Sequence, residues 1–211
     1  MTAGRRSGLR LLSAAIGLAT LVAAAPTSAG VTSSTEMHEY RVAGTTATSL
    51  VGYMKSNPFP GDEGPALANI RQSYALSLNT KDEGGVCRAS SVNLNIHFVM
   101  TLPKAVDAPA LVGSSRAAWY NFVAFARHHE ETRRSIFLQC GRDFVAKAMQ
   151  MTSKSGCSAL EASIRNMFEA AKHACDRRQL AYGRADDPRV RHLSLFVAAH
   201  GALHRVRKSP G

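Results

Sequence analysis

After its first thirty residues, this sequence lacks close cysteine pairs, a long hydrophobic run and the common nucleophile motifs. The absence of C-x2-C pairs argues against a four-cysteine zinc site. No later segment is apolar over the roughly 20 residues that a membrane-spanning helix needs. No G-x-S-x-G motif and no phosphate-binding glycine loop occurs. These absences argue against a serine hydrolase of that type, a P-loop protein and a membrane-spanning protein.

The N-terminus has the pattern of a secretory signal peptide over residues 1–29. Its start is basic, residues 11–25 form an almost uninterrupted apolar run, and Ala29 ends a small-x-small cleavage pattern. We therefore expect cleavage near Ala29 and an exported protein, periplasmic or extracellular, that consists of residues 30–211.

Acidic residues are few compared with basic ones. Without the three arginines of the signal, 23 basic and 15 acidic residues remain, a net charge of +8. The basic residues are dispersed, no recognition motif accompanies them, and export also argues against nucleic acid as a partner. An anionic surface of the cell envelope is the partner that this charge favours.

All four cysteines follow the signal, which predicts two disulfides in an oxidising compartment. They are Cys87, Cys140, Cys157 and Cys175. We assume that the helices that carry Cys140 and Cys175 form an antiparallel hairpin. Counted from the turn, the positions of these two cysteines along the helix axes then differ by roughly 9 Å, whereas those of Cys140 and Cys157 differ by about 16 Å. This estimate favours Cys140–Cys175, which leaves Cys87–Cys157.

Hydrophobic periodicity predicts one α+β domain over residues 38–211. Period-two alternation over residues 70–79 and 91–100 predicts two strands joined near Gly84-Gly85, after a first strand over 38–43. Helical patterns cover about 47–56, 115–150, 158–182 and 190–206, with a loop over 57–65 and a break at 186–188. Residues 30–37, rich in serine and threonine, are expected to form a flexible N-terminus. The expected fold is a mostly antiparallel sheet with a long hairpin, packed by a long helix and further C-terminal helices.

The helix that contains Trp119 carries three polar residues on its apolar face. On a helical wheel, His129, Glu130 and Arg133 fall within the apolar stripe. The apolar members of that stripe are Trp119, Phe122, Val123, Ala126, Phe137, Cys140 and Phe144. A buried polar group without a partner costs on the order of 1–3 kcal/mol. These three residues are therefore the candidates for a functional site.

The sequence from His129 to Arg133 differs at one position from H-E-x-x-H, the helix motif of the zincin metallopeptidases. In that motif two histidines one turn apart bind zinc, and the glutamate is the general base. The pattern predicts His129 as a zinc ligand and Glu130 as the catalytic base, but Arg133 has no lone pair to offer a metal. The alternative is an ion pair between Glu130 and Arg133, which His129 joins through a hydrogen bond.

The chain also resembles a bacterial family of predicted secreted zinc-dependent proteases, classified as a domain of unknown function. The matching pieces are residues 39–42, residues 44–46, Gly64-Pro65, the strand of Cys87, residues 101–103, Trp119 and the His129-Glu130 helix. The resemblance implies a zincin-like fold, a zinc cofactor and a peptide or protein substrate.

The chain departs from this family at two positions. The family has a histidine–arginine pair after the histidine–glutamate pair; Arg134 matches the arginine, whereas Arg133 replaces the histidine. A later aromatic–aspartate step corresponds to Tyr182-Gly183, where the aspartate is missing. These departures imply a peptidase that is weakly active or inactive.

Two functional hypotheses follow. The first is an exported zinc-metalloprotease-like protein with a degenerate motif, in which a ligand from outside the helix would join His129. The second is a non-catalytic envelope or peptide-binding protein that uses the same groove, with Arg133 holding an anionic group such as a carboxylate. Weaker candidates for the additional ligand are His97, His173, His200 and His204.

Overall fold

The computed structural model of the chain describes residues 29–61 and 64–208, with side chains described as far as Gly201. Apart from Ala29, the predicted signal peptide lies outside these residues. The elements are β1 (Ala29–Val42), α1 (Ala47–Ser56), β2 (Phe59–Gly61), β3 (Gly64–Ala66), β4 (Asn69–Glu83), β5 (Val86–Ala105), a 3-10 turn (Ala108–Ala110), α2 (Gly113–Ala148), β6 (Thr152–Ser153), α3 (Cys157–Arg191) and α4 (Ser194–Lys208). Their content and order confirm the predicted α+β class.

The sheet is built around β5, its longest strand. β4 pairs with β5 in antiparallel register, β6 adds a short antiparallel contact, and β1 lies parallel to β5 on the other side. Gly84 and Gly85 form the turn between β4 and β5 with φ values of 66° and 82°, which side chains other than glycine rarely adopt. The predicted long hairpin is therefore confirmed.

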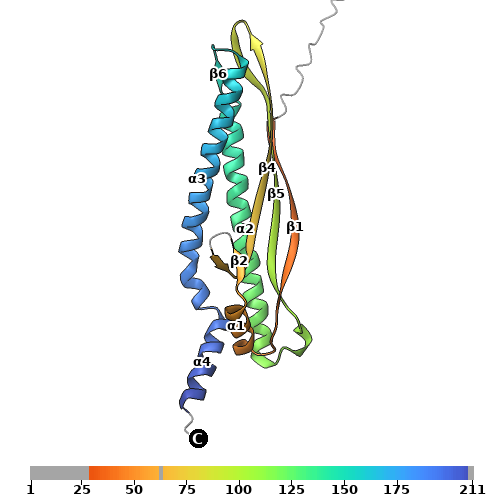
Figure 1. The fold of residues 1–211 in the computed structure, drawn as a ribbon, viewed down its shortest axis with the longest axis vertical. Coiled ribbons are helices and arrows are strands. Elements are labelled where there is room, and N and C mark those ends of the chain that lie inside the picture. Colours follow the sequence, from red (N-terminus) through yellow and green to blue (C-terminus); the bar gives the residue numbers. More distant parts are fainter. Residues whose placement is uncertain (1–28, 62–63, 209–211) are drawn as a thin grey trace, which may run out of the picture.

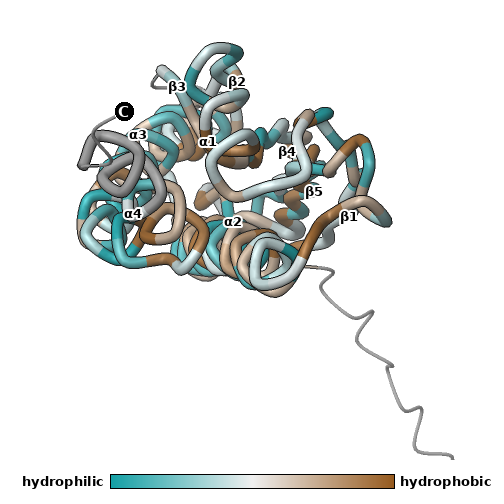
Figure 2. The backbone as a smooth tube through the Cα atoms, turned by 90° about the horizontal axis from the view of Figure 1, so that it is seen from below, coloured by the Kyte–Doolittle hydropathy of each residue, from teal (hydrophilic) through white to brown (hydrophobic). Residues whose placement is uncertain are grey.

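The molecule is elongated and has two layers. The sheet strands and the helices α2 and α3 run along its length (Figure 1). Seen from below, β1, β5 and β4 lie on one side, α3 and α4 on the other, and α2 between them (Figure 2). The inward side chains of β5, among them Leu94, Ile96 and Phe98, pack with Phe137 and Phe144 of α2.

Gly141 allows α2 to approach the sheet closely. A Cβ atom at this position would lie only 3.1 Å from Cδ2 of Leu94 and 3.2 Å from Cδ1 of Ile96. The C-terminal third of α2 is thereby held close to the centre of β5.

Both disulfides have the predicted pairing. Cys87 of β5 is bonded to Cys157 at the start of α3, and Cys140 of α2 is bonded to Cys175 of α3. The first bridge ties α3 to the sheet, and the second ties it to α2. The face of α3 that looks towards α2 is therefore fixed along its length.

Three expectations from the sequence are wrong. Residues 30–37 are not a flexible N-terminus but the first part of β1, because backbone pairing with β5 orders a segment whose side chains remain exposed. Residues 59–66 form the β2–β3 hairpin instead of a loop. The expected break at residues 186–188 does not occur, and α3 continues through Pro188 to Arg191. Asp186 makes contacts with α2 and Arg189 that favour the helical conformation although proline lacks an N–H group.

Within residues 29–61 and 64–208, no helix is long and apolar enough to cross a membrane.

Candidate functional site

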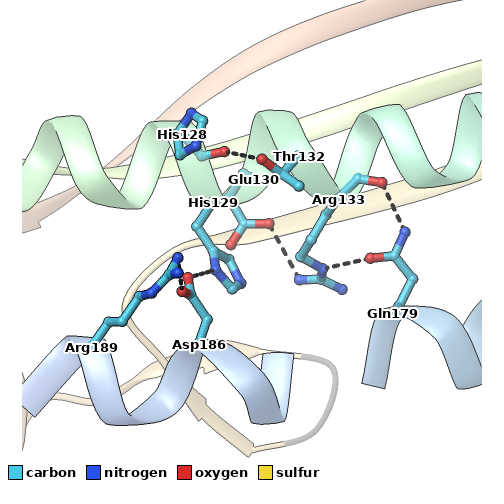
Figure 3. A network of polar contacts seen from close by, with 8 residues as sticks. All are labelled: His128, His129, Glu130, Thr132, Arg133, Gln179, Asp186 and Arg189. Carbon is cyan, nitrogen blue, oxygen red and sulfur yellow. Dashed lines mark hydrogen bonds and ion pairs between the residues drawn. The ribbon is translucent and has the colours of Figure 1, made fainter. Parts of the chain in front are cut away.

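The predicted polar residues of α2 lie together and face α3. Glu130 is almost completely buried, with 3% of its side chain exposed, while His129 and Arg133 are about one-fifth exposed. Figure 3 shows the three side chains pointing from α2 towards α3, whereas His128 and Thr132 lie on another side of the helix. The wheel thus placed His129, Glu130 and Arg133 correctly, because one helix face carries both the apolar stripe and these residues.

Glu130 and Arg133 form the ion pair expected in the alternative interpretation of the motif. Nη1 of Arg133 donates to Oε2 of Glu130 at 3.2 Å. Nε of Arg133 donates to Oε1 of Gln179 at 3.3 Å, and Nε2 of Gln179 donates to the carbonyl oxygen of Arg133 at 2.8 Å. Gln179 of α3 therefore holds both the backbone and the side chain of Arg133 (Figure 3).

His129 does not hydrogen-bond to this pair but to Asp186 of α3. Its Nδ1 lies 2.7 Å from Oδ2 of Asp186, a buried carboxylate whose Oδ1 accepts a hydrogen bond from Arg189 at 3.2 Å. The imidazole also stacks on the ring of Tyr182, with centroids 4.9 Å apart. Among the described residues Nε2 has no hydrogen-bond partner, so the ring is fixed in orientation while one nitrogen is left for a ligand.

A cleft opens beside these side chains, between α2, α3 and the chain from Gly64 to Asn69. It consists of two adjoining cavities of about 280 and 290 Å3. Both are lined by His129, Arg133, Gly183 and Asp187. A Cβ atom at position 183 would meet no atom within 4 Å, so the backbone of α3 borders open space at this point of the cleft.

Tyr40 of β1 supports the opposite wall of the cleft. Its hydroxyl donates a hydrogen bond to the carbonyl oxygen of Leu67 at 2.8 Å, and its ring stacks on Phe59 with centroids 4.5 Å apart. Burial raises the pKa of the Tyr40 phenol above its ordinary value. The hydroxyl therefore stays protonated and remains a donor to Leu67 throughout the physiological pH range.

The described side chains of this cleft do not form a zinc-binding set. Among the described side chains, no three from His, Cys, Asp and Glu are placed to hold one metal ion. The guanidinium of Arg133 occupies the position of the second histidine of the motif, and it bonds the carboxylate that would serve as base. A positive charge there opposes a divalent cation at His129.

The other histidines are not brought to His129. His97 lies on the outer face of the sheet, where its Nδ1 contacts the hydroxyl of Ser34. His173 and His200 are exposed on α3 and α4, and the side chain of His204 lies outside the described ones. His129 therefore receives no second imidazole from the described part of the chain.

Two residues of the site, Gln179 and Asp186, were missed by the sequence reasoning. Together with Tyr182 they have the i, i+3, i+7 spacing that places side chains on one face of a helix. Because Asp186 precedes Asp187-Pro188, it was interpreted as part of a helix break. The heptad spacing was the signal that could have identified this face.

The sequence profile of a bacterial protein family of unknown function, DUF922, matches residues 37–190. This range includes the last six residues of β1, the remaining sheet, α2 and α3 up to Val190, and therefore every residue of the cleft named above. Neither a curated protein nor a solved structure matches the chain.

Proposed function

This chain belongs to the bacterial family of unknown function DUF922, and we propose that it is an exported, zincin-like protein whose cleft binds a peptide without hydrolysing it. In this proposal the family resemblance to metalloproteases reflects a shared architecture, and the zinc site of the motif is replaced by Arg133. The anchor for the ligand is the guanidinium of Arg133, which holds a carboxylate of the peptide.

The observation that carries the proposal is the fixed position of Arg133. A guanidinium has five N–H donors, and the bonds to Glu130 and Gln179 use two of them. Within the described residues Arg133 makes no other hydrogen bond, and its side chain lines both cavities. The remaining donors are thus pre-oriented at the cleft, which reduces the entropy lost on binding.

Directed hydrogen bonds, more than net charge, would hold the ligand. Glu130 already balances the charge of Arg133, so long-range attraction of an anion is weak. A charge-assisted hydrogen bond between a guanidinium and a carboxylate nevertheless contributes about 1.5–3 kcal/mol. His129, which lies beside Arg133 in the cleft and is fixed by Asp186, supplies a second polar contact through Nε2.

The same contacts argue against peptide hydrolysis by the motif. A general base must accept a proton from the attacking water within hydrogen-bond distance. The carboxylate of Glu130 is buried and already accepts a hydrogen bond from the guanidinium of Arg133, so it is not positioned to take a proton from an attacking water. We therefore expect no turnover of peptide substrates that depends on Glu130.

One feature favours the zinc-peptidase hypothesis as a second candidate. Histidines that bind metals commonly donate their other ring nitrogen to a carboxylate, as His129 does to Asp186. Zinc at His129 would still require further ligands from outside α2, and the described side chains supply no suitable set.

Peptide capture tests the binding proposal. The exported protein is incubated with a library of short peptides prepared both with free and with amidated C-termini, and retained peptides are identified by mass spectrometry. We expect retention of free-acid peptides and a loss of affinity of about tenfold or more on amidation, since one charged hydrogen bond is lost. Absence of any retained peptide, or equal retention of both forms, would contradict the proposal.

Variants on α2 provide the matched controls. The double substitution Glu130→Gln with Arg133→Met removes the guanidinium without leaving its buried partner charged, and should abolish the preference for a free carboxylate. Arg134→Met removes a neighbouring guanidinium that instead contacts Ser33 and Thr35 of β1. This control should bind as the unaltered protein does.

A further inference from the structure

β1 is an unusual strand because almost none of it is buried. Eight consecutive residues, from Thr32 to Glu39, are exposed, and Met37 is 46% exposed. On its helix-side face this part of β1 is contacted by Arg134 of α2, which donates hydrogen bonds to Ser33 and Thr35, but its side chains remain exposed. Ordering a residue costs about 1–2 kcal/mol in backbone entropy, while a ladder hydrogen bond returns a net 0.5–1.5 kcal/mol. Side-chain burial contributes little to the order of this segment.

The outer edge of β1 is also open for further pairing. Within the described residues β1 pairs only with β5, in a register that runs without a shift from Ala29 to Val42. Figure 1 shows β1 at the side of the sheet far from α3. Proteins usually protect such edges with short strands, bulges, prolines or charged side chains. This 14-residue strand has no bulge and no proline, and its charged residues Glu36, Glu39 and Arg41 can be matched by opposite charges on another strand. An edge of this length is suited to accept another strand.

We propose that β1 pairs with β1 of a second copy of this chain, antiparallel and centred on Met37, to form a continuous sheet across a two-fold axis. In this register Glu36 lies opposite His38 of the other copy on the outer face, and this contact occurs twice. The two Met37 side chains meet on the helix-side face, which covers the most exposed apolar group of the strand. The dimer is thus closed and isologous.

The charges of β1, together with the length of strand that is paired, favour this register. Pairing centred on Tyr40 would also set opposite charges together, Glu39 against Arg41, but would pair only residues 38–42 of β1. Pairing centred on Glu36 would place Glu36 opposite itself, and pairing centred on Glu39 would do the same for Glu39. Pairing centred on His38 would place the two imidazoles together. Within each copy His38 already hydrogen-bonds to Glu36, and this contact lowers the pKa of Glu36, so the carboxylate is ionised at neutral pH. Centring on Met37 places no like charges opposite each other and sets two acidic groups against two basic ones.

Cysteine cross-linking tests the register directly. Residues directly opposite in an antiparallel pair have Cα atoms about 4.5–5.5 Å apart, a distance that a disulfide can span. Only the residue on the axis faces its own copy. Met37→Cys should therefore form a covalent dimer on mild oxidation. The control Thr35→Cys lies on the same face, but at 3.3 Å per residue it is roughly 13 Å from residue 35 of the other copy and should not cross-link. All four native cysteines are in disulfides and do not interfere.

A charge exchange tests the complementarity in solution. Sedimentation of the unaltered exported protein should show dimers at micromolar concentration. Glu36→Lys and His38→Glu should each weaken the dimer by about tenfold or more, because attraction becomes repulsion at two places. Combining both substitutions should restore it. A protein that is monomeric at all concentrations, equal cross-linking at positions 35 and 37, or a double variant no better than the single ones would overturn the proposal.

Discussion

At the scale of single residues, the burial of Glu130 determines how Arg133 can act. The carboxylate is 3% exposed and the guanidinium 21%, so the two partners lose different amounts of hydration. A buried carboxylate without its counter-ion costs several kcal/mol, whereas a partly exposed guanidinium can still reach water. Arg133 consequently stabilises the fold as the partner of Glu130, besides its role in the proposed binding site.

This asymmetry predicts the outcome of a double-mutant cycle. Arg133→Met should lower the free energy of unfolding by about 3 kcal/mol because the buried Glu130 loses its ion pair with Arg133. Glu130→Gln should cost less, about 1–2 kcal/mol, and the double variant should return to within about 1 kcal/mol of the unaltered protein. Urea unfolding with the disulfides intact measures all four proteins. Strictly additive effects would show that the pair is not coupled.

The three α2 residues of the site could be predicted from the sequence, but their partners could not. A wheel reveals that His129, Glu130 and Arg133 share a buried face, since this is a local property of one helix. Whether His129 meets Glu130 or Asp186 depends on how α3 packs against α2, and 57 residues separate His129 from Asp186. Such pairings are set by tertiary contacts, and a single sequence contains no direct signal for them.

At the scale of elements, the turn between β1 and α1 depends on Gly44. Its φ is 133°, and a Cβ atom there would lie 2.6 Å from Oγ of Ser49 and 2.8 Å from the backbone nitrogen of Leu50. Ser49 is also part of the N-terminal cap of α1, where its backbone N–H donates to Oγ1 of Thr46. A side chain at position 44 would therefore disturb both the backbone and the cap.

Substitution of Gly44 should destabilise the protein markedly. Gly44→Ala combines an unfavourable backbone conformation with a clash against the start of α1, and should lower the free energy of unfolding by about 2 kcal/mol or more. The control is Gly52→Ala within α1, where the added methyl group meets no atom within 4 Å and helix propensity should raise stability by roughly 0.5–1 kcal/mol. Thermal unfolding of the two variants compares them, and similar melting temperatures would contradict the role given to Gly44.

Elements with strong periodicity could be predicted, and those held by contacts with other elements could not. The alternation in β4 and β5 and the apolar stripe of α2 specify their structure locally. β1 over residues 30–37 has no fully buried face to reveal it, because it is ordered mainly by its backbone pairing with β5. Similarly, the continuation of α3 through Pro188 depends on Asp186, which is held by His129 and Arg189.

At the scale of the whole molecule, the two disulfides and the helix pair α2–α3 define the cleft. The Cys140–Cys175 bridge could be estimated from helix rise alone, since antiparallel helices bring residues of similar height together. With α3 fixed in this way, Gln179 and Asp186 stand opposite Arg133 and His129. The cleft is therefore a consequence of how the long elements pack, while its chemistry depends on the side chain at position 133.

Zinc content of the purified exported protein, measured by elemental mass spectrometry after equilibration with zinc and removal of the excess, tests the proposed function most directly. We expect far less than one zinc per chain, and an increase in Arg133→His, which places a second imidazole one helical turn from His129. One zinc per chain in the unaltered protein, lost on His129→Ala, would contradict the proposal and establish a metal centre in its place.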